Sequence, residues 1–239
     1  MRPGVRLPGL EIDMASRRLS LFSTIASKFL IALTGLSLVG FLCIHLIGNL
    51  LLYFGPAKFN AYSHALITNP FVIPAEIGLA AIFILHMLEA GMMWFSDRAA
   101  RPIAYQHAQP AGGSSRKSLA SSTMIWTGST MLIFLIIHIG TMKYGVSYPT
   151  LVHGEPGRDL SRLVVEVFQN PLWVTFYAVC MVAVGFHVWH AFSSAFESLG
   201  LNHPNLTPKV LKAGKLLSLV LGTGFFSIPI WMFFIGGRS

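Results

Sequence analysis

Long stretches without a charged side chain are the feature that most constrains what this chain can fold into. Four stretches have no charge at all: Phe29–Ala57, Ser118–Met142, Val167–Phe196 and Leu216–Gly237. A fifth apolar stretch, Phe71–Phe95, contains only two carboxylates, Glu76 and Glu89. Since a helix needs about 20 consecutive apolar residues to cross the hydrocarbon core of a bilayer, each stretch is long enough to span a membrane.

These stretches predict an all-α membrane protein with five transmembrane helices, the first four forming a bundle. We expect the helices at about residues 27–54, 71–96, 119–144, 168–197 and 211–236, with boundary errors of a few residues. The polar segments 97–118, 145–166 and 198–209 contain Gly and Pro and are predicted loops. Residues 1–20 are expected to form a flexible cytoplasmic segment before a single transmembrane domain, residues 21–239.

The composition supports this fold class and argues against others. Hydrophobic residues make up 54% of the chain and charged residues 11%, whereas a typical soluble domain has about 25% charged residues. Disorder requires the opposite balance, and two cysteines are too few for a disulfide scaffold. The net charge of +8 is not arranged as a basic face interleaved with aromatic residues, so nucleic-acid binding is not expected.

The basic residues predict the orientation of the chain. If five helices cross the membrane, 12 of the 17 Lys and Arg residues lie on the side of the N-terminus. Basic residues accumulate in cytoplasmic loops. The N-terminus is therefore expected in the cytoplasm and the C-terminus outside.

Five of the nine histidines lie inside predicted helices: His45, His86, His138, His187 and His190. One intramembrane histidine alone equally suits a hydrogen bond between helices, but ionisable side chains in a membrane indicate a functional site. Measured from charged residues at the predicted cytoplasmic ends, His45 and His138 lie about 26 and 32 Å along their helices. His86 and His187 lie about 17 and 15 Å along theirs. The depths predict an outer pair, His45/His138, and an inner pair, His86/His187.

Two histidines from different helices at one depth are the arrangement that a haem with two axial histidine ligands requires. Zinc is the alternative, but no cysteine or carboxylate clearly completes a set of four ligands at either depth. His190 matches the depth of His86 less well than His187 does, so His187 is the expected ligand. His190 then contacts a propionate or a quinone, or is an interfacial polar residue. Four glycines near these positions suit either a flat cofactor or close helix packing: Gly35, Gly40, Gly128 and Gly185.

Two segments resemble a known family. They are Lys28–Leu66 (KFLIALTGLSLVGFLCIHLIGNLLLYFGPAKFNAYSHAL) and Gly185–Pro208 (GFHVWHAFSSAFESLGLNHPNLTP). Both resemble the five-helix dihaem cytochrome b subunit that anchors bacterial succinate:quinone oxidoreductases and fumarate reductases, and the resemblance runs from about residue 24 to 235. It implies two b haems whose iron ions are bound by one histidine from each of the first four helices: His45, His86, His138 and His187.

The resemblance also implies a role in a respiratory enzyme. Such a subunit carries electrons between an iron–sulfur subunit and a membrane quinone, for which menaquinone is expected, and a flavoprotein subunit holds FAD. This chain has no Gly-rich dinucleotide fingerprint and no cluster-binding cysteine set, so the dicarboxylate chemistry is expected outside it. The complex is expected in the bacterial cytoplasmic membrane, in contact with lipid, and a higher oligomer of the complex is possible.

Other details and other functions stay open at this point. Some members of the family have a glutamate, implicated in proton movement, where this chain has Gly185. Candidates for a quinone site are His64 and Glu76 near the outer pair, or His190 near the cytoplasmic side. Glu89 either orients a ligand, relays protons or reaches the interface. The alternatives are the cytochrome b anchor of a hydrogenase or formate dehydrogenase, and a haem-free membrane transporter.

Overall fold

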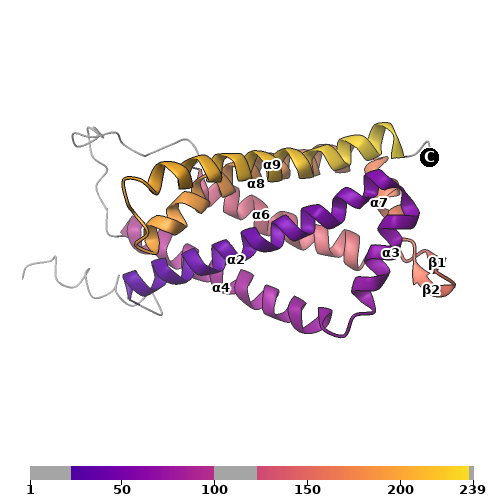
Figure 1. Cartoon of the computed structure of the whole chain (residues 1–239), viewed down its shortest axis with the longest axis horizontal. Coiled ribbons are helices and arrows are strands. Elements are labelled where there is room, and N and C mark those ends of the chain that lie inside the picture. The colour runs from indigo at the N-terminus through magenta and orange to yellow at the C-terminus, as the bar shows by residue number, and fades with distance from the viewer. Residues whose placement is uncertain (1–22, 100–122, 237–239) are drawn as a thin grey trace, which may run out of the picture.

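The computed structural model describes residues 23–99 and 123–236, so the predicted N-terminal segment 1–20 lies outside the described residues. Five helices are long and apolar enough to cross a membrane, which confirms the predicted all-α membrane fold (Figure 1). They are Thr24–Phe54, Val72–Ala99, Met124–Lys143, Pro171–Ser198 and Thr207–Phe234. The third helix begins later than the predicted residue 119, and the fifth begins earlier than the predicted residue 211.

The first crossing consists of α2 (Thr24–Leu50) and a short 3₁₀ turn, η1 (Leu51–Phe54). The hydroxyl of Ser23 caps its start by accepting a hydrogen bond from the backbone of Ala26. Gly55 has a φ of 97°, a left-handed conformation that glycine adopts without steric cost. This turn sends the chain into α3 (Pro56–Ile67), a helix between the first two crossings that the sequence analysis does not predict.

The next two crossings are α4 (Val72–Ala99) and α6 (Met124–His138), which continues into a π-helical turn, η2 (Ile139–Lys143). α4 packs mainly against α2 and makes little contact with the rest of the bundle. Its apolar side chains are therefore mostly exposed, as expected for a helix that faces lipid.

The predicted loop 145–166 contains regular structure. β1 (Pro149–Val152) and β2 (Glu155–Arg158) form an antiparallel hairpin, followed by α7 (Leu160–Phe168), which is capped by the Asp159 side chain. The two residues between the strands, His153 and Gly154, both have positive φ, as a tight hairpin turn requires. The strands are too short to give a periodic signal, but α7 has one: its apolar residues follow helical spacing after the capping Asp159, so the prediction of a loop there is wrong.

The last two crossings, α8 (Pro171–Ser198) and α9 (Thr207–Phe234), form the most extensive helix pair in the described structure. Gly185 and Gly222 let the two backbones approach closely, because a Cβ on Gly222 would lie 3.3 Å from the Cα of Gly185. α2 packs against α8 and α9, and α6 packs against α8. The crossing helices thus form one bundle with α4 at its edge.

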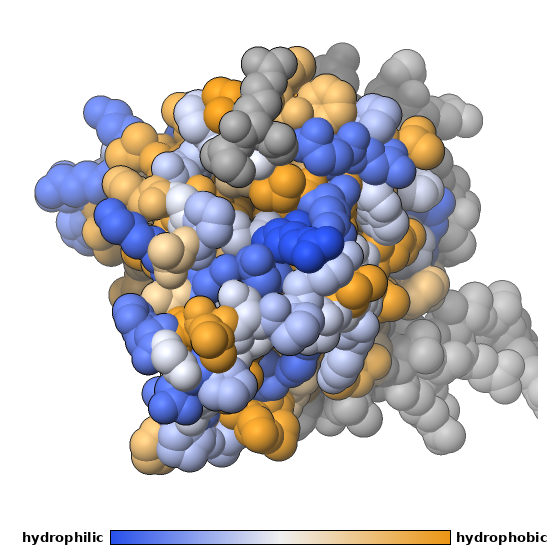
Figure 2. Space-filling model, turned by 90° about the vertical axis from the view of Figure 1, so that its right-hand side faces the viewer, coloured by the Kyte–Doolittle hydropathy of each residue, from blue (hydrophilic) through white to orange (hydrophobic). Residues whose placement is uncertain are grey.

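The short elements α3, α7, β1 and β2 all lie at one end of the bundle, on the right in Figure 1. We call this the outer end and the opposite end the inner end. Viewed from the outer end, hydrophilic residues gather near the centre of the surface (Figure 2). Asn60 ties α3 to this end through its hydrogen bonds to Asp159 and to the backbone of Ser161. At the surface, hydrogen bonds from Tyr148 and Arg162 lower the pKa of Glu166.

Candidate functional site

Two of the predicted ligands meet in the outer half of the bundle. His45 of α2 and His138 of α6 have ring centroids 5.9 Å apart, and their ring planes are nearly perpendicular at 85°. His138 is the last residue of α6 before the π-helical turn η2, and such turns occur frequently at functional sites. The structure therefore brings together the two residues that the depth calculation paired as the outer pair.

Aromatic side chains surround the outer pair. Phe41 stacks on His45 and Phe134 stacks on His138, each with ring centroids 5.2 Å apart. The hydroxyl of Tyr177 lies 3.3 Å from Nδ1 of His138. Both imidazoles are therefore fixed by packing against rings on their own helices, with one hydrogen bond from α8.

The inner pair is held by a different kind of contact. Oγ1 of Thr34 on α2 lies 3.0 Å from Nδ1 of His86 on α4. Oγ1 of Thr127 on α6 lies 3.1 Å from Nδ1 of His187 on α8. Each histidine is thus anchored to the helix that precedes it among the crossings.

These hydrogen bonds set the protonation of the imidazole nitrogens. The Thr34 hydroxyl donates its single proton to the backbone carbonyl of Leu30, 2.6 Å away, so it accepts a hydrogen bond from Nδ1–H of His86. The Thr127 hydroxyl likewise lies 3.1 Å from two carbonyl oxygens of its own helix. A neutral imidazole with a proton on Nδ1 has its lone pair on Nε2, which is the form that binds a metal.

Two glycines make room for the inner histidines. A Cβ on Gly35 would lie 3.2 Å from Cε1 of His86, and a Cβ on Gly128 would lie 3.5 Å from Cε1 of His187. The other two predicted glycines are placed differently: Gly185 packs against α9, and Gly40 has nothing within 4 Å of its Cβ position. The small residues beside the ligands are therefore Gly35 and Gly128.

Thr34 and Thr127 are not among the site residues predicted from the sequence, although a signal for them exists. Thr34-Gly35 and Thr127-Gly128 each precede an outer histidine with the same spacing, T-G-x9-H, in α2 and again in α6. The eleven residues from threonine to histidine place the inner and outer levels about 16 Å apart. This repeated spacing identifies both threonines once the two helices are compared.

Glu89 is the buried residue of α4. Its side chain is 0% exposed, and neither carboxylate oxygen has a hydrogen-bond partner among residues 23–99 and 123–236. Ser96, two turns further along the same face of α4, also has a buried hydroxyl without a partner. An unsatisfied buried polar group costs about 1–3 kcal/mol, so the interior beside His86 contains polar atoms that the described protein residues do not satisfy.

Two of the three quinone-site candidates, His64 and Glu76, lie at the outer end, whereas His190 is a neighbour of His187 on α8. His64 of α3 lies against Gly157 of the hairpin, and Glu76 forms an ion pair with Lys143 at the outer end. His190 is half-buried, one turn beyond His187 on α8. The structure joins none of these three to a histidine pair through the hydrogen bonds of the described residues.

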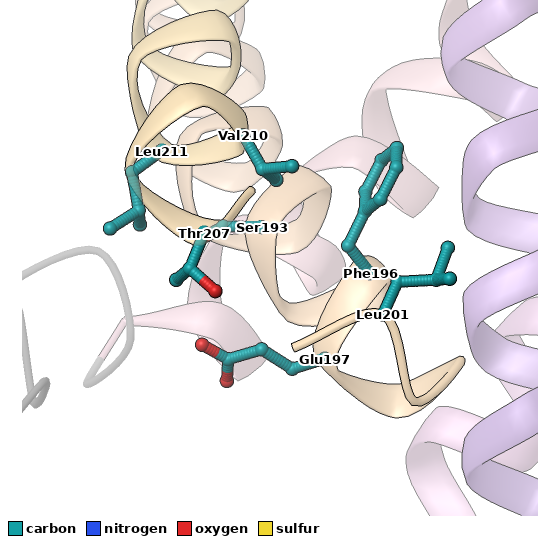
Figure 3. Close-up of a pocket in the computed structure, with 7 residues that line it drawn as sticks. All are labelled: Ser193, Phe196, Glu197, Leu201, Thr207, Val210 and Leu211. Atoms are coloured by element: carbon teal, nitrogen blue, oxygen red, sulfur yellow. The ribbon is translucent and has the colours of Figure 1, made fainter. Parts of the chain in front are cut away.

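A small pocket at the inner end lies between the end of α8 and the start of α9 (Figure 3). Glu197 and Thr207 contribute oxygen atoms to its rim, and its volume is about 10 Å³. That volume holds at most one water molecule, so this pocket is not a site for a cofactor.

Among residues 23–99 and 123–236, no group of three or more His, Cys, Asp or Glu side chains is placed to hold a metal ion. The intramembrane histidines thus occur as pairs and not as part of a larger cluster. Comparison of the chain with family models, with curated proteins and with solved structures finds no match in any of the three.

Proposed function

We propose that this chain is the membrane-anchor cytochrome b subunit of a bacterial succinate dehydrogenase or fumarate reductase. In this role it carries electrons between an iron–sulfur subunit and a membrane quinone through two b haems. His45 and His138 would hold the iron of the outer haem, and His86 and His187 would hold that of the inner haem. The observation that carries the proposal is that four intramembrane histidines form two pairs whose supporting residues repeat with T-G-x9-H spacing.

The outer pair fits a haem iron. A histidine nitrogen lies about 2 Å from a metal that it binds, so two imidazoles on opposite sides of one ion have ring centres about 6 Å apart. The ring centroids of His45 and His138 are 5.9 Å apart. Two protein ligands would suffice for a haem iron, because the haem macrocycle itself supplies the others.

The inner pair fits on other grounds. Nδ1 of both His86 and His187 is bonded to a threonine, which leaves Nε2 of each ring for the iron. Gly35 and Gly128 keep side-chain atoms away from these two rings. The unpartnered carboxyl of Glu89 is a group that a further polar ligand would satisfy.

A bound b haem supplies one-electron transfer at its iron. The chain holds and orients each ligand ring and keeps water away. In the outer half, the stacked rings of Phe41 and Phe134 fix the two imidazoles. In the inner half, Thr34 and Thr127 fix the tautomer and the rotation of the rings, and such supporting hydrogen bonds typically change metal affinity 10–100-fold.

The choice of a succinate or fumarate complex depends on the likeness of Lys28–Leu66 and Gly185–Pro208 to that family. We further propose that the inner end faces the bacterial cytoplasm, as the distribution of basic residues predicts. The iron–sulfur and flavoprotein subunits then dock at this end, and the quinone is taken from the surrounding membrane.

Purification of the tagged full chain from its native membrane in a mild detergent tests the proposal. We expect a flavoprotein and an iron–sulfur protein to co-purify. We also expect that added succinate reduces the haem iron, so that the absorption spectrum of reduced b haem appears. Co-purification of a hydrogenase or formate dehydrogenase subunit would replace the succinate assignment but keep the dihaem site. A preparation without haem would overturn both.

A further inference from the structure

A groove of about 530 Å³ follows the line where α8 and α9 pack together. Its lining includes Gly185 and Gly222, where the backbones of the two helices approach closely. By helical periodicity, the α8 residues that line it lie on the side of that helix opposite His187. The groove is therefore a separate feature from the histidine pairs.

The groove has the length of one membrane leaflet. Along α9 it extends from Lys215 to Phe226, a rise of about 16 Å. Half of a bilayer's hydrocarbon core is about 15 Å thick. Most of the lining side chains are apolar, among them Met181, Phe186 and Leu219. Its volume lies in the range of about 300–1,000 Å³ that is typical of small-molecule sites.

Basic side chains mark one end of the groove. Lys215 lines this end, and its Nζ lies 5.8 Å from the ring centroid of Trp189. Lys212 and Lys209 precede it at intervals of three residues, so the three lysines continue along one side of α9. No ion pair joins any of them to a carboxylate in the part of the chain that the structure describes. This end of the groove thus carries positive charge that the described residues do not neutralise.

We propose that the groove binds one phospholipid with an anionic headgroup. An acyl chain lies along the apolar groove between α8 and α9, and the headgroup phosphate lies at Lys215 and Lys212 beside Trp189. The lysines are at the inner end, which the charge distribution predicts to be cytoplasmic, and basic pockets between helices on this side bind anionic lipids. A quinone has an uncharged ring and would gain no comparable attraction from these lysines. This proposal is independent of the proposed electron-transfer function.

The test is lipid binding to the purified full chain after delipidation in detergent, measured by native mass spectrometry. The probes are phosphatidylglycerol and phosphatidylcholine with identical acyl chains. We expect one phosphatidylglycerol to remain bound under conditions that remove phosphatidylcholine. Lys215→Gln and Lys212→Gln should each weaken its binding about fivefold, because one basic residue near an anionic lipid surface contributes about 1 kcal/mol.

Two further variants distinguish lipid binding in the groove from lipid binding to basic residues elsewhere on the surface. Thr223→Trp fills the groove and should reduce binding while all lysines remain. Lys28→Gln removes an exposed lysine at the inner end of α2, away from the groove, and should leave binding unchanged. Equal binding of the two lipids, an equal loss with Lys28→Gln, or unchanged binding in both Lys215→Gln and Thr223→Trp would overturn the proposal. Recovery of a quinone as the tightly bound molecule would overturn it as well.

Discussion

The outer and inner halves of the bundle hold their histidines in different ways. In the outer half, His45 and His138 are in ring contact and stack on Phe41 and Phe134. In the inner half, hydrogen bonds join His86 and His187 to threonines on neighbouring helices, Thr34 and Thr127. Packing therefore fixes the outer pair, whereas polar contacts fix the inner pair.

The difference has a consequence for how each site responds to change. Ring stacking and apolar burial are tolerant of small polar substitutions, because no single atom carries the contact. The inner pair depends on one hydroxyl per ring. On the same helix as His86, polar atoms of Glu89 and Ser96 have no partner among the described residues. The inner site should thus be the more sensitive of the two to substitutions that do not touch a ligand.

The largest expected effect comes from removing an outer ligand. His45→Ala or His138→Ala should remove the outer haem and leave the inner one, because each pair lies at its own level about 16 Å from the other. The measurement is the haem content per chain together with the reduced-minus-oxidised spectrum. Loss of the inner haem alone from His45→Ala would contradict the pairing.

Substitutions on α8 show which of its two histidines, His187 or His190, is needed for the inner haem. His187→Ala should remove the inner haem, since Thr127 holds the ring of His187 in place. His190→Ala should keep both haems and serves as the matched control one turn away on the same helix. If His190→Ala loses a haem while His187→Ala retains it, the assignment on α8 is wrong.

Removing the supporting hydroxyls should weaken the inner site and spare the outer one. Thr34→Val or Thr127→Val should lower inner-haem affinity about 10–100-fold, because the ring loses the acceptor for Nδ1–H. The measurement is haem loss to an excess of a haem-free acceptor protein.

The control for this comparison is Thr130→Val. Thr130 lies on α6 with Thr127 and donates to the backbone carbonyl of Trp126 at 2.9 Å, but it is only half-buried and has no hydrogen bond to a histidine among the described residues. An equal loss of affinity with Thr130→Val would show that the effect arises from α6 itself and not from the bond to His187.

Glu89 offers a stability test of the inner half. Glu89→Leu should raise the free energy of unfolding of the haem-free chain by about 1–3 kcal/mol, because it removes an unsatisfied buried carboxyl. Thermal unfolding in detergent measures the change. Glu76→Leu, which breaks an exposed ion pair with Lys143, should lower the free energy of unfolding by at most about 1 kcal/mol. A destabilisation by Glu89→Leu would mean that its carboxyl has a partner in the haem-free protein.

The smallest expected effect comes from adding a methyl group beside His86. Gly35→Ala places a Cβ 3.2 Å from the ring, so the imidazole must shift by a few tenths of an ångström. We expect a cost of about 1 kcal/mol in inner-haem binding, at the low end for overpacked sites. Gly40→Ala, with nothing within 4 Å of its Cβ position, should bind haem as the natural chain does.

The five crossing helices can be predicted from the sequence, because an uncharged run long enough to cross a bilayer must satisfy its backbone hydrogen bonds internally and therefore forms a helix. The elements that the sequence did not predict, α3, α7 and the hairpin, all lie at the outer end. Run length marks none of them, because they are short. Helical periodicity does mark α7, after its capping residue Asp159, but that pattern lies inside a segment whose Gly and Pro residues indicate a loop.

The candidate site also contains residues that the sequence predicts and residues that it does not. His45, His86, His138 and His187 stand out because ionisable residues are rare in membrane helices, and the rise per residue is enough to pair them. Thr34 and Thr127 do not stand out, since threonine in a helix commonly bonds to its own backbone. Only the repeated T-G-x9-H spacing marks them. The burial of Glu89 depends on how α4 packs, which local sequence does not determine.

The measurement that tests the central claim most directly is a count of b haems on the purified chain. A dithionite-reduced minus oxidised spectrum and a pyridine haemochrome assay give the number of haems per chain. Two b haems per chain, one lost in His45→Ala and the other in His187→Ala, is the predicted result. A chain purified without b haem, or one that loses the same haem in both variants, would contradict the two-pair arrangement.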